Sequence, residues 1–187
     1  MSVVGFGAPS VEAIGIIYLC SRCEALRIFI RRSFLLDVRS WPGAFVFAFL
    51  ALFIGAVSHA LWDHLVATSS IAGGWSEATH PLSSMWAGRI FLVFYFSCIT
   101  VMVEEVVFKV LLLTVLPKTI GALRYAILSA ALFSLAHVSQ GGVKVITVFL
   151  FIGFPGALYF YVSRNLGAVV FFHAVFNFWS LSFIFFK

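Results

Sequence analysis

The sequence predicts an all-α fold, a polytopic bundle of about six transmembrane helices with an active site inside the membrane. Of the 187 residues, 63% are hydrophobic and only 10% are charged, whereas a soluble domain carries about 25% charged residues. The apolar residues form long runs, and a helix needs about 20 such residues to cross a bilayer. The few ionisable residues inside these runs gather in three short motifs, and ionisable residues within membrane spans are functional by default.

Six apolar runs follow one another along the chain, and each predicts a membrane span. The predicted spans cover residues 3–20, 42–62, 89–116, 120–138, 145–162 and 166–186. The first is the weakest because Pro9 and Glu12 interrupt it. Pro117 ends the unusually long third run, since proline disfavours a helical conformation at the residue before it. We expect an N-terminal membrane region, residues 1–88, followed by a core, residues 89–187, that carries all three motifs.

Basic residues between the runs predict the orientation. The stretch 22–39 holds five arginines against two acidic residues, and the turns at 117–124 and 163–165 add three basic residues. Because cytoplasmic loops are enriched in Lys and Arg, we place these segments in the cytoplasm, which gives eight basic residues inside and three outside. The net charge of +5 therefore comes from the loops, and we expect the lipid bilayer, and no nucleic acid, as a partner.

Two further polar patterns carry no catalytic prediction. Cys20 and Cys23 form a lone C-x-x-C, and no second ligand pair follows at the spacing of a zinc site. We interpret them as reduced cysteines at the cytoplasmic membrane face. The other pattern comprises His59, Asp63, His64 and His80. Its spacing could bind a metal, but we interpret it as the polar, interfacial end of the second span and the loop beyond it.

The first motif places two adjacent glutamates near the middle of the third span. Glu105 and Lys109 are four residues apart with the acid first, so they can pair along one helix face. Glu104 points about 100° away from this pair, because successive residues of an α-helix are rotated by that angle. Pairing with Lys109 would neutralise Glu105 and leave Glu104 outside that pair.

The second and third motifs place two histidines and an amide on later spans. His137 follows Phe133 by one helical turn, so the two share a helix face, and Asn177 follows His173 by the same spacing. At a rise of 1.5 Å per residue, Glu104 and His137 each lie about 18–20 Å from the turn that joins their helices. Because a short turn makes these helices antiparallel neighbours, we expect the two side chains to meet, with the third motif close enough to join them.

In this order, E-E-V-V-F-K, F-S-L-A-H and H-A-V-F-N resemble the three motifs of the CPBP family of intramembrane endopeptidases. The family includes CAAX-processing Rce-type proteases and Abi-type, bacteriocin-processing relatives, and its pattern is E-E-x-x-x-R, F-x-x-x-H and H-x-x-x-N or D. The resemblance covers about residues 89–186. Lys109 stands where the family has arginine, which keeps the charge but lacks the planar, bidentate guanidinium.

The resemblance implies an enzyme that hydrolyses a peptide bond near the membrane in a membrane-associated peptide or protein, at a C-terminal tail, leader or sorting signal. It implies that Glu104 and His137 activate a water molecule, with Glu104 as the general base. It also implies that His173 and Asn177 bind the oxyanion. The supporting residues are Glu105, Lys109 and Phe133.

We expect no cofactor, and the alternative is a zinc ion held by Glu104, His137 and His173 with one open position. That mechanism ranks second because the sequence contains no H-E-x-x-H motif. Two other functions stay open. Lys109 favours a non-catalytic membrane partner or regulator of the same fold, and the absence of a sequence repeat disfavours a proton-coupled transporter. The short chain indicates a multi-pass protein of a prokaryotic inner membrane.

Overall fold

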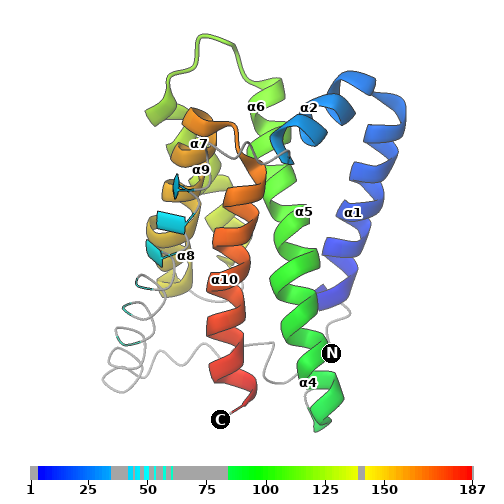
Figure 1. The fold of residues 1–187 in the computed structure, drawn as a ribbon, viewed down its shortest axis with the longest axis vertical. Coiled ribbons are helices and arrows are strands. Elements are labelled where there is room, and N and C mark those ends of the chain that lie inside the picture. Colours follow the sequence, from blue (N-terminus) through cyan, green and yellow to red (C-terminus); the bar gives the residue numbers. More distant parts are fainter. Residues whose placement is uncertain are drawn as a thin grey trace.

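The described chain folds into helices that run side by side (Figure 1). A computed structural model describes residues 4–34, 84–138 and 142–186, with scattered positions between 42 and 60. Every regular element in these residues is helical, as predicted. The helices are α1 (Val4–Arg22), α2 (Glu24–Phe34), α4 (Trp86–Phe94), η3 (Tyr95–Thr100), α5 (Val101–Glu105), η4 (Val106–Leu111), α6 (Leu112–Val115), α7 (Ala122–Leu135), α8 (Gly142–Val148), η6 (Phe149–Gly153), α9 (Phe154–Ser163) and α10 (Leu166–Phe185). Most of the predicted second span, together with His59, Asp63, His64 and His80, lies outside the described residues.

Two helices are long and apolar enough to cross a membrane. The elements α4 to α6 join into one helix, Trp86–Val115, of 30 residues, and α8 to α9 provide a second, Lys144–Ser163, of 20 residues. Shorter apolar helices cover Ala13–Arg22, Ala122–Leu135 and Leu166–Ser182. The bundle therefore agrees with the predicted fold class, and two of the six predicted spans have the length and hydropathy of a complete crossing.

The long helix changes its winding twice. The segments η3 and η4 are π-helical, and α5 lies between them. Such wide turns are uncommon, occur mostly as single turns inside α-helices, and often mark functional sites. The helix ends at Leu116, whose extended backbone (φ −81°, ψ 152°) precedes Pro117, as the proline predicted.

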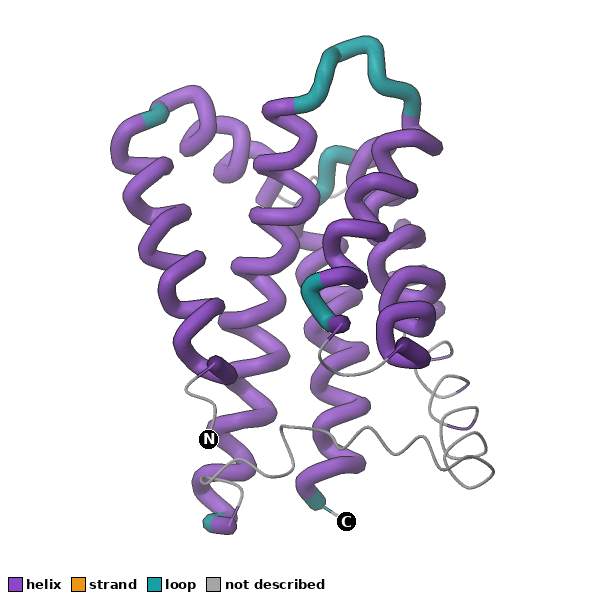
Figure 2. The backbone as a smooth tube through the Cα atoms, turned by 180° about the vertical axis from the view of Figure 1, so that it is seen from behind, coloured by secondary structure: helices purple, strands orange, loops and turns teal. Residues whose placement is uncertain are grey.

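Helices α7, α9 and α10 complete the part of the bundle that carries the motifs. Figure 2 shows the described trace from behind, with the long helix running up and α7 returning beside α9. Arg164 takes a left-handed conformation (φ 56°) at the end of α9 and turns the chain. Asn165 then caps α10 by accepting a hydrogen bond of 2.9 Å from the amide of Ala168. This tight turn sets α10 beside both α9 and the long helix.

Within the basic stretch 22–39, residues Glu24–Phe34 form the helix α2, which was not predicted from the sequence. In α2, Leu26 is buried against the core while Arg27, Arg31 and Arg32 are exposed. The helix crosses the end of the bundle at which α1 ends and α10 begins (Figure 1). An amphipathic helix with an exposed basic face fits the headgroup level of a membrane.

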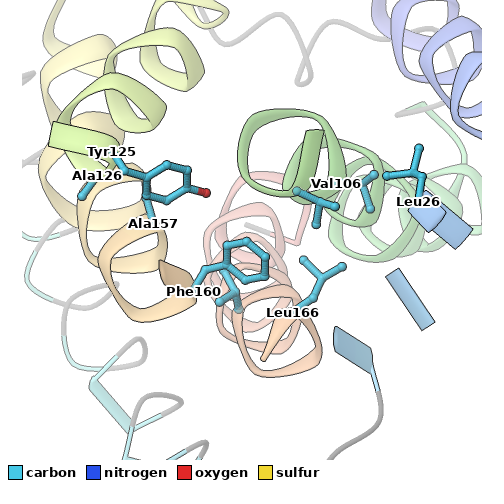
Figure 3. Packing of buried hydrophobic residues seen from close by; sticks show 9 residues of the cluster. Leu26, Val106, Tyr125, Ala126, Ala157, Phe160 and Leu166 are labelled. Carbon is cyan, nitrogen blue, oxygen red and sulfur yellow. The ribbon is translucent and has the colours of Figure 1, made fainter. Parts of the chain in front are cut away.

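Small residues allow the close packing of α7 on the helix of residues 144–163. A Cβ atom added to Gly153 would lie 3.1 Å from the Cα atom of Ala130, so the two backbones nearly touch. Around them, Tyr125 and Phe160 fill the centre of the main apolar cluster (Figure 3). Because lipid offers helices no hydrophobic advantage in associating, close backbone approach and van der Waals contact hold such interfaces together.

Candidate active site

The two glutamates of the first motif lie on α5, between the two π-helical segments. Glu105 is completely buried, whereas the side chain of Glu104 keeps 16% of its surface exposed. The two acids thus differ in environment although they are adjacent in sequence. Glu104 is the one that a water molecule can reach.

Glu105 is held by two partners. Its Oε2 atom forms an ion pair with Nζ of Lys109, and both side chains are completely buried. Its Oε1 atom lies 2.8 Å from Nδ1 of His173. The pair with Lys109 was predicted from spacing, but the bond to His173 was not, because it depends on how α10 is rotated against the long helix.

The side chain of Lys109 packs closely against Phe133 and Gly156. Its Nζ atom lies 5.2 Å from the ring centre of Phe133, a cation–π contact. A Cβ atom added to Gly156 of α9 would come within 3.2 Å of Cε and 3.7 Å of Nζ of Lys109. The absence of a side chain at Gly156 therefore makes room for the lysine that replaces the family's arginine.

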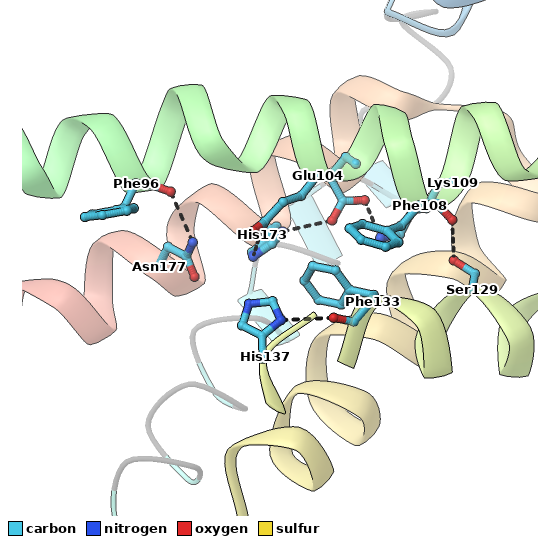
Figure 4. A network of polar contacts seen from close by, with 10 residues as sticks. Phe96, Glu104, Phe108, Lys109, Ser129, Phe133, His137, His173 and Asn177 are labelled. Carbon is cyan, nitrogen blue, oxygen red and sulfur yellow. Dashed lines mark hydrogen bonds and ion pairs between the residues drawn. The ribbon is translucent and has the colours of Figure 1, made fainter. Parts of the chain in front are cut away.

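His173 connects the two acids. Its Nδ1 atom bonds to Glu105, and its Nε2 atom faces Oε2 of Glu104 at 3.8 Å (Figure 4). Because Glu105 is paired with Lys109 and accepts, Nδ1 carries the hydrogen in that bond. We call Lys109, Glu105, His173 and Glu104 the four-residue network. Its two ends are a buried ammonium and a partly exposed carboxyl group.

The proton content of the four-residue network follows from its burial. Lys109 and Glu105 cancel each other's charge. Glu104 and His173 cancel when they hold one further proton between them, either as carboxylate and imidazolium or as carboxylic acid and imidazole. Both states leave the network neutral, which a low-dielectric surrounding demands. A neutral network would hold one such proton, on either Glu104 or His173.

His137 joins the group through Phe133. The Nδ1 atom of His137 lies 3.0 Å from the main-chain oxygen of Phe133, which can only accept, so Nδ1 donates. In the neutral ring this leaves a lone pair on Nε2. The Phe133 ring meets the His137 ring edge-on at 4.9 Å and the His173 ring at 5.4 Å. Figure 4 shows both imidazoles beside this ring, with His173 above His137 in that view.

Asn177 lies one turn beyond His173 on α10 and contacts the other π-helical segment. Its Nδ2 atom donates to the main-chain oxygen of Phe96 in η3 at 3.2 Å. The side-chain amide carries a second N–H, so this bond fixes its orientation without using all its donors. The structure thus sets Asn177 beside the same helix that carries the glutamates.

The sequence reasoning missed two residues of α7. The hydroxyl of Tyr125 donates to the main-chain oxygen of Lys109 at 2.9 Å, and that of Ser129 donates to the main-chain oxygen of Phe108 at 2.7 Å. Both are completely buried. A tyrosine and a serine in an apolar run give no signal of their own, and only the predicted proximity of the two helices could have directed attention to them.

The zinc alternative requires Glu104, His137 and His173 to bind one ion together. Within the described part of the chain, no three His, Cys, Asp or Glu side chains are grouped so that they could hold a metal ion. His173 directs both ring nitrogens at carboxyl groups. We therefore derive no step through a metal, and the zinc alternative with Glu104, His137 and His173 stays a prediction.

The comparison with protein families agrees with the motifs. A family model described as type II CAAX prenyl endopeptidase Rce1-like matches residues 84–179, just over half of the chain. Searches of curated proteins and of solved structures found no match. The chain therefore belongs to the Rce1-like family, which confirms the resemblance seen in the sequence. This is a family of membrane proteases, and the two long apolar helices agree with an integral membrane protein.

Proposed function

We propose that this chain is an intramembrane endopeptidase that hydrolyses a peptide bond near the membrane surface in a membrane-associated protein or peptide. The observation that carries the proposal is the position of Glu104. Its carboxyl group is the partly exposed end of the four-residue network and lies 3.8 Å from Nε2 of His173. Its side chain keeps 16% of its surface exposed, so water can reach it. Family membership supports protease activity in general.

In the proposed mechanism, the network first holds its shared proton on His173, so that Glu104 is a carboxylate. Glu104 removes one proton from a water molecule as the water oxygen attacks the carbonyl carbon of the substrate. The lone pair on Nε2 of His137 accepts a hydrogen bond from the other O–H of the water and so orients the molecule. The tetrahedral intermediate then breaks at its C–N bond, and Glu104 returns its proton to the leaving nitrogen.

Charge balance supports a role for His173 at the oxyanion. When Glu104 takes the proton from water, the network acquires a net charge of about +1, and an oxyanion of charge −1 forms next to it. The Nε2–H of the His173 imidazolium no longer faces a carboxylate and can donate to that oxygen. The second N–H of Asn177, one helical turn away, is the proposed second donor.

The substrate class follows from the family's description. We propose a membrane-associated substrate cleaved at a C-terminal tail, leader or sorting signal, with a prenylated C-terminal peptide as the first to test. We further propose the multi-pass topology of about six spans, in a prokaryotic inner membrane. In the long helix, the rise from Glu104 to Val115 is about 17 Å, which supports a site inside the bilayer.

The test uses the full chain reconstituted in liposomes with an internally quenched peptide that ends in a farnesylated CAAX sequence. Peptide termini in cell membranes are compared in parallel, so that another substrate class is also detected. Glu104→Gln should abolish cleavage in both assays, and Glu24→Gln, which changes an exposed acid in α2, should not. Cleavage at the normal rate by Glu104→Gln would overturn the proposal. Loss of cleavage with a zinc chelator would favour the zinc alternative.

A further inference from the structure

We infer that Tyr125 and Ser129 of α7 are positioning residues, which hold the π-helical segment η4 in the form that aligns Glu105 with His173. The inference rests on the proposed function, because it assigns these hydroxyl groups to the same site. Neither residue belongs to a motif, and neither contacts the carboxyl groups directly. Their hydrogen bonds to the main chain of the long helix carry the argument.

The two donors and two acceptors match in spacing. Tyr125 and Ser129 are four residues apart and therefore share one face of α7. They donate to the consecutive carbonyl groups of Lys109 and Phe108, at 2.9 and 2.7 Å. Both side chains are completely buried, so an unpaired hydroxyl or carbonyl group left there would be costly. Figure 4 shows the Ser129 bond reaching across from α7 to the long helix.

Both acceptors lie where the hydrogen bonding of the long helix changes. Phe108 and Lys109 are in the middle of η4, Val106–Leu111. The amide of Leu112, the first residue after η4, bonds to the carbonyl of Lys109, only three residues earlier. A wide turn followed by a tight bond departs from the regular ladder, in which each amide bonds to the carbonyl four residues before it. Side chains that bond into this ladder are a recognised cause of such departures.

The winding of η4 decides how Glu105 is rotated about the helix axis relative to the residues that follow η4. Each residue of an α-helix advances the chain by about 100° around the axis, so one extra residue in a turn rotates all that follow by about that angle. Glu105 is the last residue before η4, and Lys109 lies within it. If η4 relaxed to regular α-helix, Glu105 and Lys109 would still share a helix face, but the parts of the long helix before and after η4 would rotate relative to each other, and the carboxylate of Glu105 would turn relative to His173 on α10.

The line of contacts therefore runs from α7 to the proposed oxyanion site. Tyr125 fixes the main chain of Lys109, whose ammonium group pairs with Glu105. Glu105 in turn accepts from Nδ1 of His173 and so orients the Nε2 atom that faces Glu104. A change at Tyr125 should alter the imidazole of His173 without touching it.

Two other hydroxyl groups provide matched controls. Ser134 is buried on the same helix but donates to the carbonyl of Ala130 in α7 itself. Tyr161 donates at 2.6 Å to the main chain of Ile120, in the turn before α7. Removing either hydroxyl deletes a hydrogen bond of comparable type without affecting η4.

The deciding experiment is nitrogen-15 magnetic resonance of histidine-labelled protein in proteoliposomes, because it needs no substrate. The imidazole signals of His173 are assigned with H173N, and Glu105→Gln defines the displacement when its partner changes. Tyr125→Phe and Ser129→Ala should each displace the His173 signals by at least half of the displacement that Glu105→Gln causes. Ser134→Ala and Tyr161→Phe should leave them in place. If the Tyr125 and Ser129 variants match the controls, the inference is overturned.

Kinetics with the farnesylated peptide separate this inference from the proposed function. Each positioning variant should lower kcat about tenfold to a hundredfold, as loss of outer-shell partners does, with KM nearly unchanged. If Glu104→Gln is inactive but Tyr125→Phe and Ser129→Ala keep the normal kcat, only the inference is overturned. If Glu104→Gln is active, the proposed function is overturned, and the resonance experiment still decides the positioning. If both positioning variants fail to fold while the controls fold, the two hydroxyl groups are structural, and the inference is overturned.

Discussion

Replacing Lys109 with methionine tests whether the buried ion pair holds the bundle together. Methionine keeps much of the length of the side chain and removes its charge, so Glu105 would be left as an uncompensated buried carboxylate. Breaking a buried pair in this way costs about 3–5 kcal/mol of folding free energy. The bond from His173 to Glu105, at 2.8 Å, remains and offsets part of the loss. We therefore expect a cost of about 3 kcal/mol, at the lower end of that range.

The double variant Lys109→Met with Glu105→Gln separates pairing from packing. It removes both charges together, so no carboxylate is left unpaired, and we expect it to recover about 2 kcal/mol relative to Lys109→Met alone. The measurement is reversible unfolding in mixed micelles, followed by circular dichroism. Arg27→Gln is the control, because its pair with Glu24 is exposed on both sides and such pairs contribute at most about 1 kcal/mol.

Two outcomes would refute this reasoning. If the free energy of unfolding of Lys109→Met lies within about 0.5 kcal/mol of that of the original protein, the ion pair contributes no net stability. If the double variant is as unstable as the sum of the two single variants, the two side chains act independently, and the cost comes from lost packing against Phe133 and α9.

Three further predictions follow from single features. Gly156→Ala should lower the free energy of unfolding by about 1–3 kcal/mol in the same assay, because its Cβ atom would lie 3.2 Å from Cε of Lys109. The control is Gly15→Ala in α1, whose Cβ atom would meet nothing within 4 Å and should cost nothing. Equal costs for the two variants would contradict close packing between Gly156 and Lys109. Asn165→Ala should lower the free energy of unfolding by about 1 kcal/mol because it removes the N-cap of α10, whereas Asn165→Asp should keep most of the stability of that cap. Cys23, which is exposed beside the basic helix α2, should react with a membrane-impermeant maleimide only from the cytoplasmic side; labelling from outside would reverse the proposed orientation.

Helix positions were predictable because they depend on hydrophobicity and on a few strong local signals. The predicted span 166–186 corresponds to α10, Leu166–Phe185, and the predicted break at Pro117 lies where the long helix ends. In contrast, α2 was missed because its apolar residues cover only one face. Methods based on long apolar runs do not detect an amphipathic helix of 11 residues.

Around the candidate site, contacts within one helix were more predictable than contacts between helices. Spacing predicted the pair of Glu105 and Lys109, since both lie on one helix. The bond from Glu105 to His173 joins two helices, and it depends on the rotation of each about its axis. The π-helical turns change that rotation by one residue, and no periodicity of apolar residues reports a single inserted residue. The hydroxyl groups of Tyr125 and Ser129 were hidden for the same reason.

The end of α7 leaves main-chain carbonyl groups available as hydrogen-bond acceptors, whereas in a continuous helix they would be bonded to amides of the next turn. Its 14 residues extend about 21 Å, less than the about 30 Å of a hydrocarbon core. A helix that stops there leaves carbonyl groups that need donors. The amide of His137 bonds to Ser134, so the carbonyl of Phe133 is left to the imidazole of His137 instead. One side chain thus completes the end of the helix, and its second nitrogen can accept a hydrogen bond from the water of the proposed mechanism.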